Sequence, residues 1–386
     1  MNQQEKWGII TLTLLMFVIG TSEFIVIGLL AEIADDLNVS ISVAGLLISV
    51  FAISYAIGTP IITAFCSRFE KYPLCLSLMI LFIIGNAISA CAENFYTLLW
   101  SRIFIAVLSG ALISLAMVIS NEIVKVEKRA ATIALVFAGF SVANVIGVPL
   151  GTWIGQLSNW RIVFWLNALL GIWVLLLQIK FLPKNLSGQM ISLSSQLALL
   201  KNSKIIFLIL IPTLGAAATF TIYTYISAIL TESMGVNSQY ISFILLVFGI
   251  FAVISNILSS TLAKHNGLRN LMYLFILQAI IYLILFKTIE SLWLGLLTLF
   301  AMALLFYTMN TTIQLYLMSL SKGDFSDFKD FLASLTPVAI NLGIAIGAYL
   351  GGLGIQIASF KSLPIISTVL VILAAILSWY MFRKRA

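Results

Sequence analysis

Apolar residues fill long, nearly uninterrupted stretches of this chain, and short polar segments separate them. A helix needs about 20 apolar residues to cross the hydrocarbon core of a bilayer. In the first part of the chain the stretches that qualify are 8–30, 42–66, 73–92, 96–119, 131–156 and 162–183. In the second part they are 205–230, 239–263, 270–286, 291–319, 331–357 and 363–382. The pattern therefore predicts an all-α membrane protein with twelve transmembrane helices.

The composition points to the same class of protein. Of the 386 residues, 61% are hydrophobic and 9% are charged, whereas soluble domains carry about a quarter charged residues. Too few polar residues are present to cover a soluble core of this size. The cysteines Cys66, Cys75 and Cys91 lie in or beside spans without metal-ligand or disulfide spacing, so we expect small packing residues and no metal.

The basic residues are distributed unevenly between the segments that join the spans. With the N-terminus in the cytoplasm, seventeen Lys and Arg residues fall in cytoplasmic segments and three fall in outer loops, namely Arg161, Lys287 and Lys361. Cytoplasmic loops of membrane proteins carry such an excess. The distribution predicts that both termini are cytoplasmic, and it accounts for the net charge of +7 without a nucleic-acid partner.

The longest segment outside the spans lies near the middle of the chain. Residues 184–204 are more polar than their neighbours and are expected to form a cytoplasmic linker. The predicted organisation is an N-terminal six-helix half over residues 1–183, the linker over 184–204, and a C-terminal six-helix half over 205–386.

Two glycine ladders support this division into halves. The fifth and eleventh spans each place glycine at every fourth residue: Gly147, Gly151 and Gly155, and Gly343, Gly347 and Gly351. Glycines on one helix face let two helices approach closely in lipid, and helix packing alone would explain a single ladder. Two ladders 196 residues apart (343 − 147 = 196) indicate parallel repeats, as in secondary transporters with a site between the halves. Pro149 adds a break in the backbone of the fifth helix.

These features together resemble the major facilitator superfamily. The fifth span, Gly139-Phe-Ser-Val-Ala-Asn144-Val-Ile-Gly147-Val-Pro149-Leu-Gly151, is similar to a loosened antiporter motif of the twelve-helix drug/proton exchangers. The first span, with Gly20-Thr-Ser-Glu23-Phe followed by Ala-Asp35-Asp36-Leu-Asn-Val-Ser-Ile, is similar to the sugar-efflux and chloramphenicol-exporter branch. The resemblance implies two six-helix halves around a central cavity that the first and fourth helices help to line.

The chain departs from the family pattern in the loop between the second and third spans. Ser67 stands where the family has an aspartate, and Glu70 stands where it has a glycine. Arg68 and Lys71 keep the basic character of this loop, so the resemblance implies a gating role for them. A gating ion pair that depends on the family's aspartate has no equivalent acid at position 67.

Two charged residues lie inside the predicted spans at a similar depth. Glu23 is the acidic residue deep in an apolar stretch, and Arg102 is the basic residue well inside a span. A charge at such a depth costs about 3 kcal/mol on insertion scales. At about 1.5 Å per residue, both lie about 10 Å below the outer surface. The pair could form a permanent ion pair, or Glu23 could alternate between protonated and charged forms with Arg102 tuning it, or Glu23 could merely be hydrated at the interface. We favour the second of these, in which the Glu23 carboxyl alternates between its protonated and charged forms. The resemblance links Arg102, with Gly110 after it in the same span, to proton transfer.

Polar residues within other spans are candidates for binding a substrate. They are Tyr223 and Tyr225 in the seventh span, Tyr307, Asn310 and Gln314 in the tenth, and Asn144 and Asn341 in the fifth and eleventh. Hydrogen bonding between helices is the alternative role for each of them. None is charged, which favours neutral or weakly cationic amphipathic substrates. The sequence shows no phosphate-binding glycine loop and no pair of catalytic carboxylates, so we expect neither an enzyme nor a cofactor.

We therefore expect a proton-coupled exporter of small organic molecules such as drugs, acting by alternating access in the inner (plasma) membrane of a bacterium. Its expected partners are the substrate, protons and the lipid bilayer, and we expect a monomer. Proton-linked uptake of a sugar or nucleoside is the main alternative. A membrane scaffold or sensor that transports nothing is a more remote one.

Overall fold

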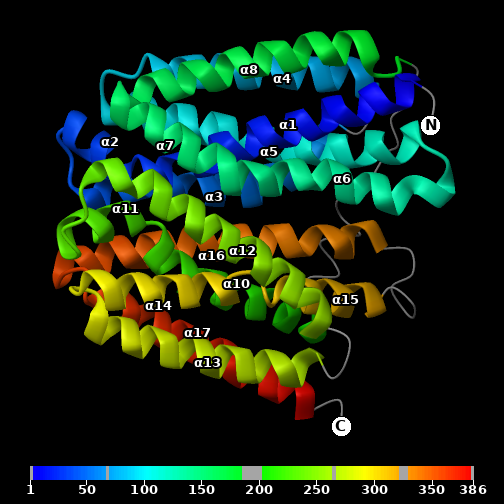
Figure 1. The fold of residues 1–386 in the computed structure, drawn as a ribbon. Helices are drawn as coiled ribbons and strands as arrows, with labels where there is room; N and C mark the ends of the chain where they lie inside the picture. Colours follow the sequence, from blue (N-terminus) through cyan, green and yellow to red (C-terminus); the bar gives the residue numbers. More distant parts are fainter. Residues whose placement is uncertain (1–2, 67–68, 185–201, 263–266, 321–328, 384–386) are drawn as a thin grey trace. The chain divides into compact units, whose positions relative to one another are not determined.

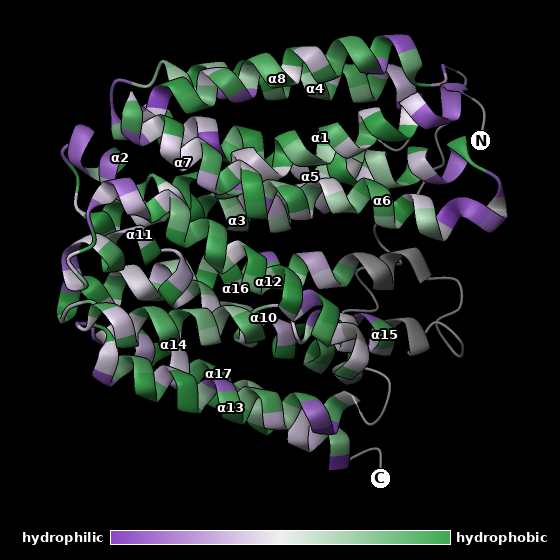
Figure 2. Ribbon diagram, in the orientation of Figure 1, coloured by the Kyte–Doolittle hydropathy of each residue, from purple (hydrophilic) through white to green (hydrophobic). Residues whose placement is uncertain are grey.

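The structure is a computed structural model that describes residues 3–66, 69–184, 202–262, 267–320 and 329–383 (Figure 1). Within these ranges the chain forms helices and their connections, and no strand. Twelve helical spans are long and apolar enough to cross a membrane. Figure 2 shows hydrophobic residues along the helices and hydrophilic residues gathered toward their ends. The predicted all-α protein with twelve transmembrane helices is confirmed.

The first six spans and the segments between them form ten helical elements. They are α1 (Gln3–Gly28), α2 (Leu30–Asp36), α3 (Ile41–Cys66), α4 (Lys71–Ala90), α5 (Phe95–Ile123), η1 (Val126–Lys128), α6 (Arg129–Val142), η2 (Ala143–Gly147), α7 (Val148–Leu157) and α8 (Trp160–Phe181). The fifth span is thus composed of α6, η2 and α7, and η2 is a single π-helical turn. Pro149 follows this turn at the start of α7, where a residue without an N–H is well tolerated.

The last six spans also contain interruptions. Their elements are α10 (Ser203–Tyr223), α11 (Ile226–Ala228), η3 (Ile229–Ser233), η4 (Ser238–Tyr240), α12 (Ile241–Leu262), α13 (Gly267–Thr288), α14 (Leu292–Leu305), α15 (Asn310–Leu320), α16 (Lys329–Ile357) and α17 (Ser362–Arg383). The ninth span, predicted over 270–286, is longer than expected because α13 extends at both ends. The tenth span is divided into α14 and α15.

The chain forms two compact units, the first comprising residues 1–39 and 54–192 and the second residues 40–53 and 193–386. The first part of α3 therefore groups with the second unit, which the predicted division did not include. Within that unit the hydroxyl of Ser42 donates to the Gly352 carbonyl at 2.7 Å, and that of Ser49 donates to the Ala345 carbonyl at 2.8 Å. The predicted linker, residues 184–204, lies almost wholly outside the described residues, and the domain boundaries stay a prediction.

The glycine ladder of the first unit packs against α1. A Cβ atom added at Gly147 would lie 2.4 Å from the Thr21 hydroxyl oxygen. The next two glycines face the ends of longer side chains, those of Ile25 in α1 and of Leu29 just after α1. A Cβ at Gly151 would lie 2.4 Å from Ile25 Cδ1, and one at Gly155 would lie 2.5 Å from Leu29 Cδ2. The ladder therefore holds the fifth span against the first through side-chain contacts.

The ladder of the second unit packs against α10 more closely. A Cβ added at Gly343 would lie 2.4 Å from the carbonyl oxygen of Thr213, and one at Gly347 would lie 2.4 Å from that of Ala217. At Gly351 the added atom would meet the Tyr225 ring at 2.7 Å and the Thr221 carbonyl oxygen at 2.8 Å. Here backbone contacts backbone, so these glycines set the distance between α16 and α10.

Candidate transport site

Glu23 and Arg102 are both buried inside the first unit, on α1 and α5. Glu23 is 6% exposed and Arg102 is fully buried. The two helices pack against each other, and the pair is close enough for a direct electrostatic interaction. The structure therefore brings together the two intramembrane charges that depth alone paired in the sequence.

Arg102 contacts the backbone of α1. Its guanidinium donates to the carbonyl oxygens of Ser22 at 2.6 Å and of Glu23 at 3.0 Å. The ion pairs found among the described residues join other residues. The Glu23 Oε2 atom is buried and accepts no hydrogen bond from the described part of the chain. The arginine thus hydrogen-bonds the helix segment that bears the acid.

A tyrosine of α3 is a further neighbour of Glu23. Tyr55 is 5% exposed and interacts electrostatically with the carboxylate. Sequence analysis did not select it, because a tyrosine within an apolar span is also a common packing residue. The Glu23 carboxyl therefore has an arginine and a phenol nearby within the first unit.

Behind Ser22 lies a buried polar cluster that sequence analysis also missed. The Ser22 hydroxyl donates to Asn86 Oδ1 at 3.0 Å, and Asn167 Nδ2 donates to the same oxygen at 3.0 Å. The Asn86 Nδ2 group donates to the Phe82 carbonyl in its own helix, α4. All three polar residues are at most 4% exposed. The available signal was an asparagine deep in each of two apolar spans, where an amide is expected to hydrogen-bond between helices.

The loop after α3 is described in part. Arg68, one of the two predicted gating residues, lies outside the described residues. Lys71, the other, is 7% exposed at the start of α4 and forms an ion pair with Glu122 in the last turns of α5. Lys71 therefore joins α4 and α5 within the first unit, and its gating role stays a prediction.

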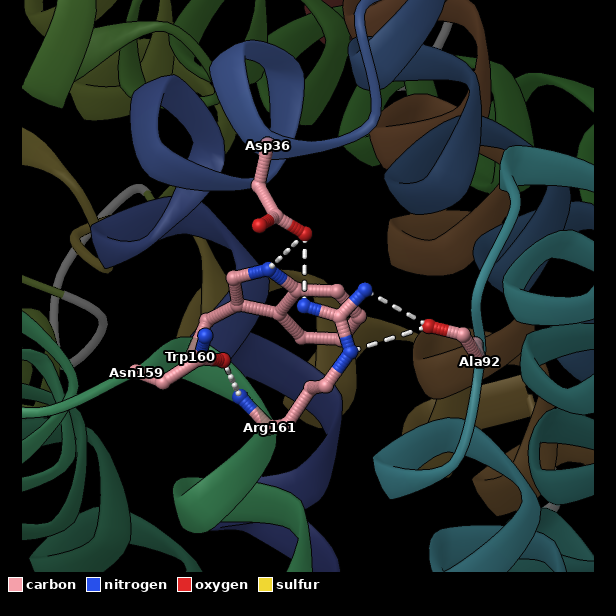
Figure 3. Close-up of polar contacts among 5 residues, drawn as sticks. All are labelled: Asp36, Ala92, Asn159, Trp160 and Arg161. Carbon is pink, nitrogen blue, oxygen red and sulfur yellow. Dashed lines mark hydrogen bonds and ion pairs between the residues drawn. The ribbon is translucent and has the colours of Figure 1, made fainter.

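Far from the Lys71–Glu122 ion pair, where α4 ends and α5 begins, Arg161 links three segments of the first unit (Figure 3). Its guanidinium donates to Asp36 Oδ2 at 2.5 Å and to the Ala92 carbonyl at 2.8 and 3.0 Å. The Trp160 indole N–H also donates to Asp36 Oδ2, at 3.1 Å. Nearby, Glu32 Oε1 accepts from the Gln156 amide at 3.3 Å. These contacts tie α2 to the loop between α4 and α5, to the start of α8 and to the end of α7.

The two tyrosines predicted on the seventh span have different surroundings. Tyr223 stacks on Phe248 with ring centroids 4.9 Å apart and meets Phe306 edge-on at 5.2 Å. Tyr225 is fully buried, and its hydroxyl donates to the Ala348 carbonyl at 2.6 Å. Tyr223 is thus part of an aromatic cluster of the second unit, while the hydroxyl of Tyr225 is used in helix packing.

The break between α14 and α15 positions Tyr307 and Asn310. Two serines one turn apart on α12 satisfy backbone groups near this break: the Tyr307 N–H donates to Ser255 Oγ at 2.8 Å, and the Thr311 N–H donates to Ser259 Oγ at 3.0 Å. Both serines are fully buried. Asn310 Oδ1 is buried and has no hydrogen-bond partner among the described residues. The break is therefore stabilised by neighbouring side chains, as irregular backbone at membrane depth requires.

The remaining predicted substrate residues are spread over both units. Asn144 lies in the π-helical turn η2, and its amide donates to the Phe140 carbonyl at 3.3 Å. Asn341 is 6% exposed on α16, where its amide donates to the Pro337 carbonyl at 3.2 Å. Gln314 is exposed on α15. A role of these residues in binding stays a prediction.

Twelve spans, two units with matching glycine ladders and buried polar groups within the spans are the features of a multi-pass membrane protein. Comparison with known proteins identifies its family. The model of the Major Facilitator Superfamily matches residues 12–326. The chain therefore belongs to the Major Facilitator Superfamily, whose members are transporters and not enzymes.

Relatives in sequence are named as transporters. The uncharacterized MFS-type transporter YtbD of Bacillus subtilis is 36% identical, over 91% of this chain and 89% of its own. The inner membrane transport protein YdhP of Escherichia coli (strain K12) is 30% identical, over 98% of this chain and 97% of its own. A probable sugar efflux transporter of Mannheimia succiniciproducens is 31% identical, over 70% and 68% of the two chains.

Solved structures support the fold. A bacterial homologue of the human lysosomal transporter Spinster, in an inward-facing and unoccupied conformation, matches with a TM-score of 0.78 and 15% identity, covering 99% of this chain and 98% of that one. A D-xylose–proton symporter matches with a TM-score of 0.78 and 14% identity, covering 96% of each chain. At these identities the likeness extends to the fold alone.

Proposed function

We propose that the chain is a proton-coupled exporter of small neutral or weakly cationic amphipathic molecules. The observation on which this proposal rests most is the buried carboxyl of Glu23. Arg102 interacts electrostatically with this carboxyl and donates hydrogen bonds to the α1 backbone beside it. An ionisable residue kept at membrane depth in a transporter is a functional-site hypothesis by default.

In the proposed cycle, Glu23 takes up a proton in the outward-open state as the substrate leaves. In the inward-open state it releases that proton as substrate binds from the cytoplasm. Direct contact between proton and substrate is not required, because it suffices that each favours a different state of the protein. The uncharged candidates Tyr223, Tyr307, Asn310 and Asn341 suit a substrate with little or no charge.

The proposal includes an orientation. Both termini would face the cytoplasm of a bacterium, because that placement leaves seventeen of the basic residues on the cytoplasmic side and three on the other. In this orientation Glu23 lies in the outer half of α1, within reach of protons that enter from outside.

Efflux is favoured over uptake by two observations. The fifth span resembles an antiporter motif, and one relative bears the name of a probable sugar efflux transporter. That name also suggests a second substrate class, sugars, as an alternative to the amphipathic molecules proposed above. Sugars need several hydrogen-bonding partners, and the candidate polar residues of this chain are spread over both units.

Everted membrane vesicles with an acidic interior test the mechanism, its direction and the substrate class together. A panel of amphipathic cations, neutral drugs and sugars is added outside, and the interior pH is followed with a fluorescent dye. An antiporter alkalinises the interior when its substrate is added, whereas a symporter acidifies it further. A response to sugars alone would favour the second substrate class.

Glu23→Gln should abolish the alkalinisation while the protein remains folded. Glu93→Gln is the matched control, because Glu93 is an exposed acid in the loop between α4 and α5. Alkalinisation that persists in Glu23→Gln would overturn the role of Glu23. Failure of the whole panel to change the interior pH in the wild type would count against proton-coupled export.

A further inference from the structure

We infer that Ser22 and Asn86 are positioning residues for the Glu23–Arg102 pair. This inference rests on the proposed function, and it adds two residues from the buried polar cluster to the proton site. They would act by holding the peptide units to which Arg102 binds. Neither residue is ionisable, so any effect on the proton must pass through the geometry of α1.

Ser22 is held from two sides. Its carbonyl oxygen accepts from the Arg102 guanidinium of α5 at 2.6 Å, and its hydroxyl donates to Asn86 Oδ1 of α4 at 3.0 Å. Asn167 of α8 donates to the same amide oxygen and so fixes the Asn86 side chain. Ser22 and Asn86 are fully buried. Three helices therefore fix the rotation of α1 at the residue before Glu23.

This restraint determines where the guanidinium lies. Arg102 binds two consecutive carbonyls, those of Ser22 and Glu23, which requires one orientation of that helix turn. If the link from Ser22 to Asn86 is lost, this turn of α1 can rotate. The Arg102 guanidinium can then lose one of its two carbonyl partners. The guanidinium would then be held less firmly near the carboxyl, and it would stabilise the charged carboxylate less.

The charged and titratable neighbours of Glu23 are few. Arg102 faces it from α5 and Tyr55 from α3. The other elements packed against α1, namely α2, α6, η2, α7 and α8, bring no charged group to the carboxyl among the described residues. A change in the protonation of Glu23 after substitution of Ser22 would therefore report on the Arg102 geometry.

The test is an infrared pH titration of the purified full-length protein in nanodiscs, which needs no substrate. The carboxyl C=O band of Glu23 is assigned by its loss in Glu23→Gln. Ser22→Ala should shift the midpoint of this band to higher pH by about 0.5 unit or more, about 0.7 kcal/mol. Ser22→Thr keeps the hydroxyl and should restore the wild-type midpoint.

Ser109→Ala is the matched control, because Ser109 is a fully buried serine of α5 whose hydroxyl bonds within its own helix, to the Ile105 carbonyl. It should leave the midpoint unchanged. Asn86→Leu is the second variant, in case Ser22→Ala does not fold. It should shift the midpoint in the same direction, and the double variant should shift it no further, because both substitutions break one link.

The outcomes separate the inference from the proposed function. If no titrating band disappears in Glu23→Gln, the proton switch itself is wrong. If the band is present but neither Ser22→Ala nor Asn86→Leu moves it, the positioning role is wrong even though the switch stands. A lower unfolding temperature with an unchanged midpoint would show that the cluster serves packing alone.

Discussion

The two units follow one internal repeat, but they differ in what lies at corresponding positions. The ladders are offset by 196 residues, as are the starts of α2 and α11 (226 − 30) and of α4 and α13 (267 − 71). With this offset Glu23 corresponds to Thr219, since 219 − 23 = 196, and Arg102 corresponds to Thr298, since 298 − 102 = 196. The first unit thus places charges where the second places neutral hydroxyls.

A side-chain hydrogen bond joins the corresponding pair of helices in both units, but its first partner is not equivalent, because Ser22 corresponds to Ala218 (218 − 22 = 196) and Thr219 to Glu23. In the first, Ser22 of α1 bonds Asn86 of α4. In the second, the Thr219 hydroxyl of α10 lies 3.2 Å from the hydroxyl of Tyr282 in α13, and Tyr282 corresponds to Asn86 (282 − 86 = 196). The helix packing can therefore be kept while, at these positions, the first unit carries the charged residues Glu23 and Arg102 and the second carries threonines.

The ladders differ as well. The glycines of the first unit face side chains of α1 and of Leu29 just after it, whereas Gly343 and Gly347 face backbone carbonyls of α10. A side-chain end can rotate away from an added methyl group, but a carbonyl moves only if the whole helix moves. The second unit is therefore expected to be the less tolerant of the two at its ladder.

The largest expected effect comes from Gly347→Ala. Its Cβ would lie 2.4 Å from the Ala217 carbonyl oxygen and 3.0 Å from two further backbone atoms of α10. The helices must separate, at a cost of about 3 kcal/mol or more. Gly151→Ala, which meets Ile25 Cδ1, should cost about 1 kcal/mol. Thermal unfolding in detergent compares the two variants, and equal losses would contradict the assigned difference between the ladders.

How much of this comparison the sequence predicts depends on the kind of feature. The twelve spans follow from apolar length, and the ladders follow from spacing, because both are properties of one helix at a time. The sequence also predicts that Glu23 and Arg102 lie at a similar depth below the membrane surface, because this depth is counted along each helix separately. Depth leaves the rotation of a helix about its axis undetermined, so the hydrogen bonds from Arg102 to the carbonyls of α1 could not be predicted.

Features that need several helices at once escaped prediction for the same reason. The break after Leu305 contains neither proline nor glycine, and Ser255 and Ser259, whose side chains stabilise it, lie about fifty residues away on α12. The first part of α3 groups with the second unit through Ser42 and Ser49, which in the sequence look like any small polar residues of a span.

A smaller effect is expected from Tyr282→Phe. The variant removes one hydroxyl partner, while Thr219 keeps its bond to the Gly215 carbonyl. The expected loss is about 1 kcal/mol of unfolding free energy. The infrared midpoint of Glu23 should not move, because this link belongs to the second unit and Glu23 to the first. Tyr349→Phe, at an exposed tyrosine of α16, is the control. A shifted midpoint would show that the two links are not independent.

The smallest effect concerns Glu32 in α2, which corresponds to the buried Ala228 of the second unit (228 − 32 = 196). Burial raises the pKa of Glu32 above its ordinary value of 4.5, although hydrogen bonds from its own backbone and from Gln156 act in the opposite direction. A raised pKa means that the folded protein binds this proton more tightly than the unfolded chain does. The associated stability is fully present below pH 4.5 and is lost as the pH rises through the raised pKa.

Glu32→Gln removes this ionisation and keeps an amide that can bond Gln156. In the wild type, Glu32 contributes to the fall in unfolding free energy above pH 4.5. The variant should lack this contribution. The difference is expected to be about 0.5 kcal/mol or less, as for substitutions away from tightly packed sites. Unfolding curves of both proteins across this pH range measure it. Parallel curves at every pH would mean that Glu32 is ionised alike in the folded and unfolded chain, so that burial in the first unit does not act on this acid.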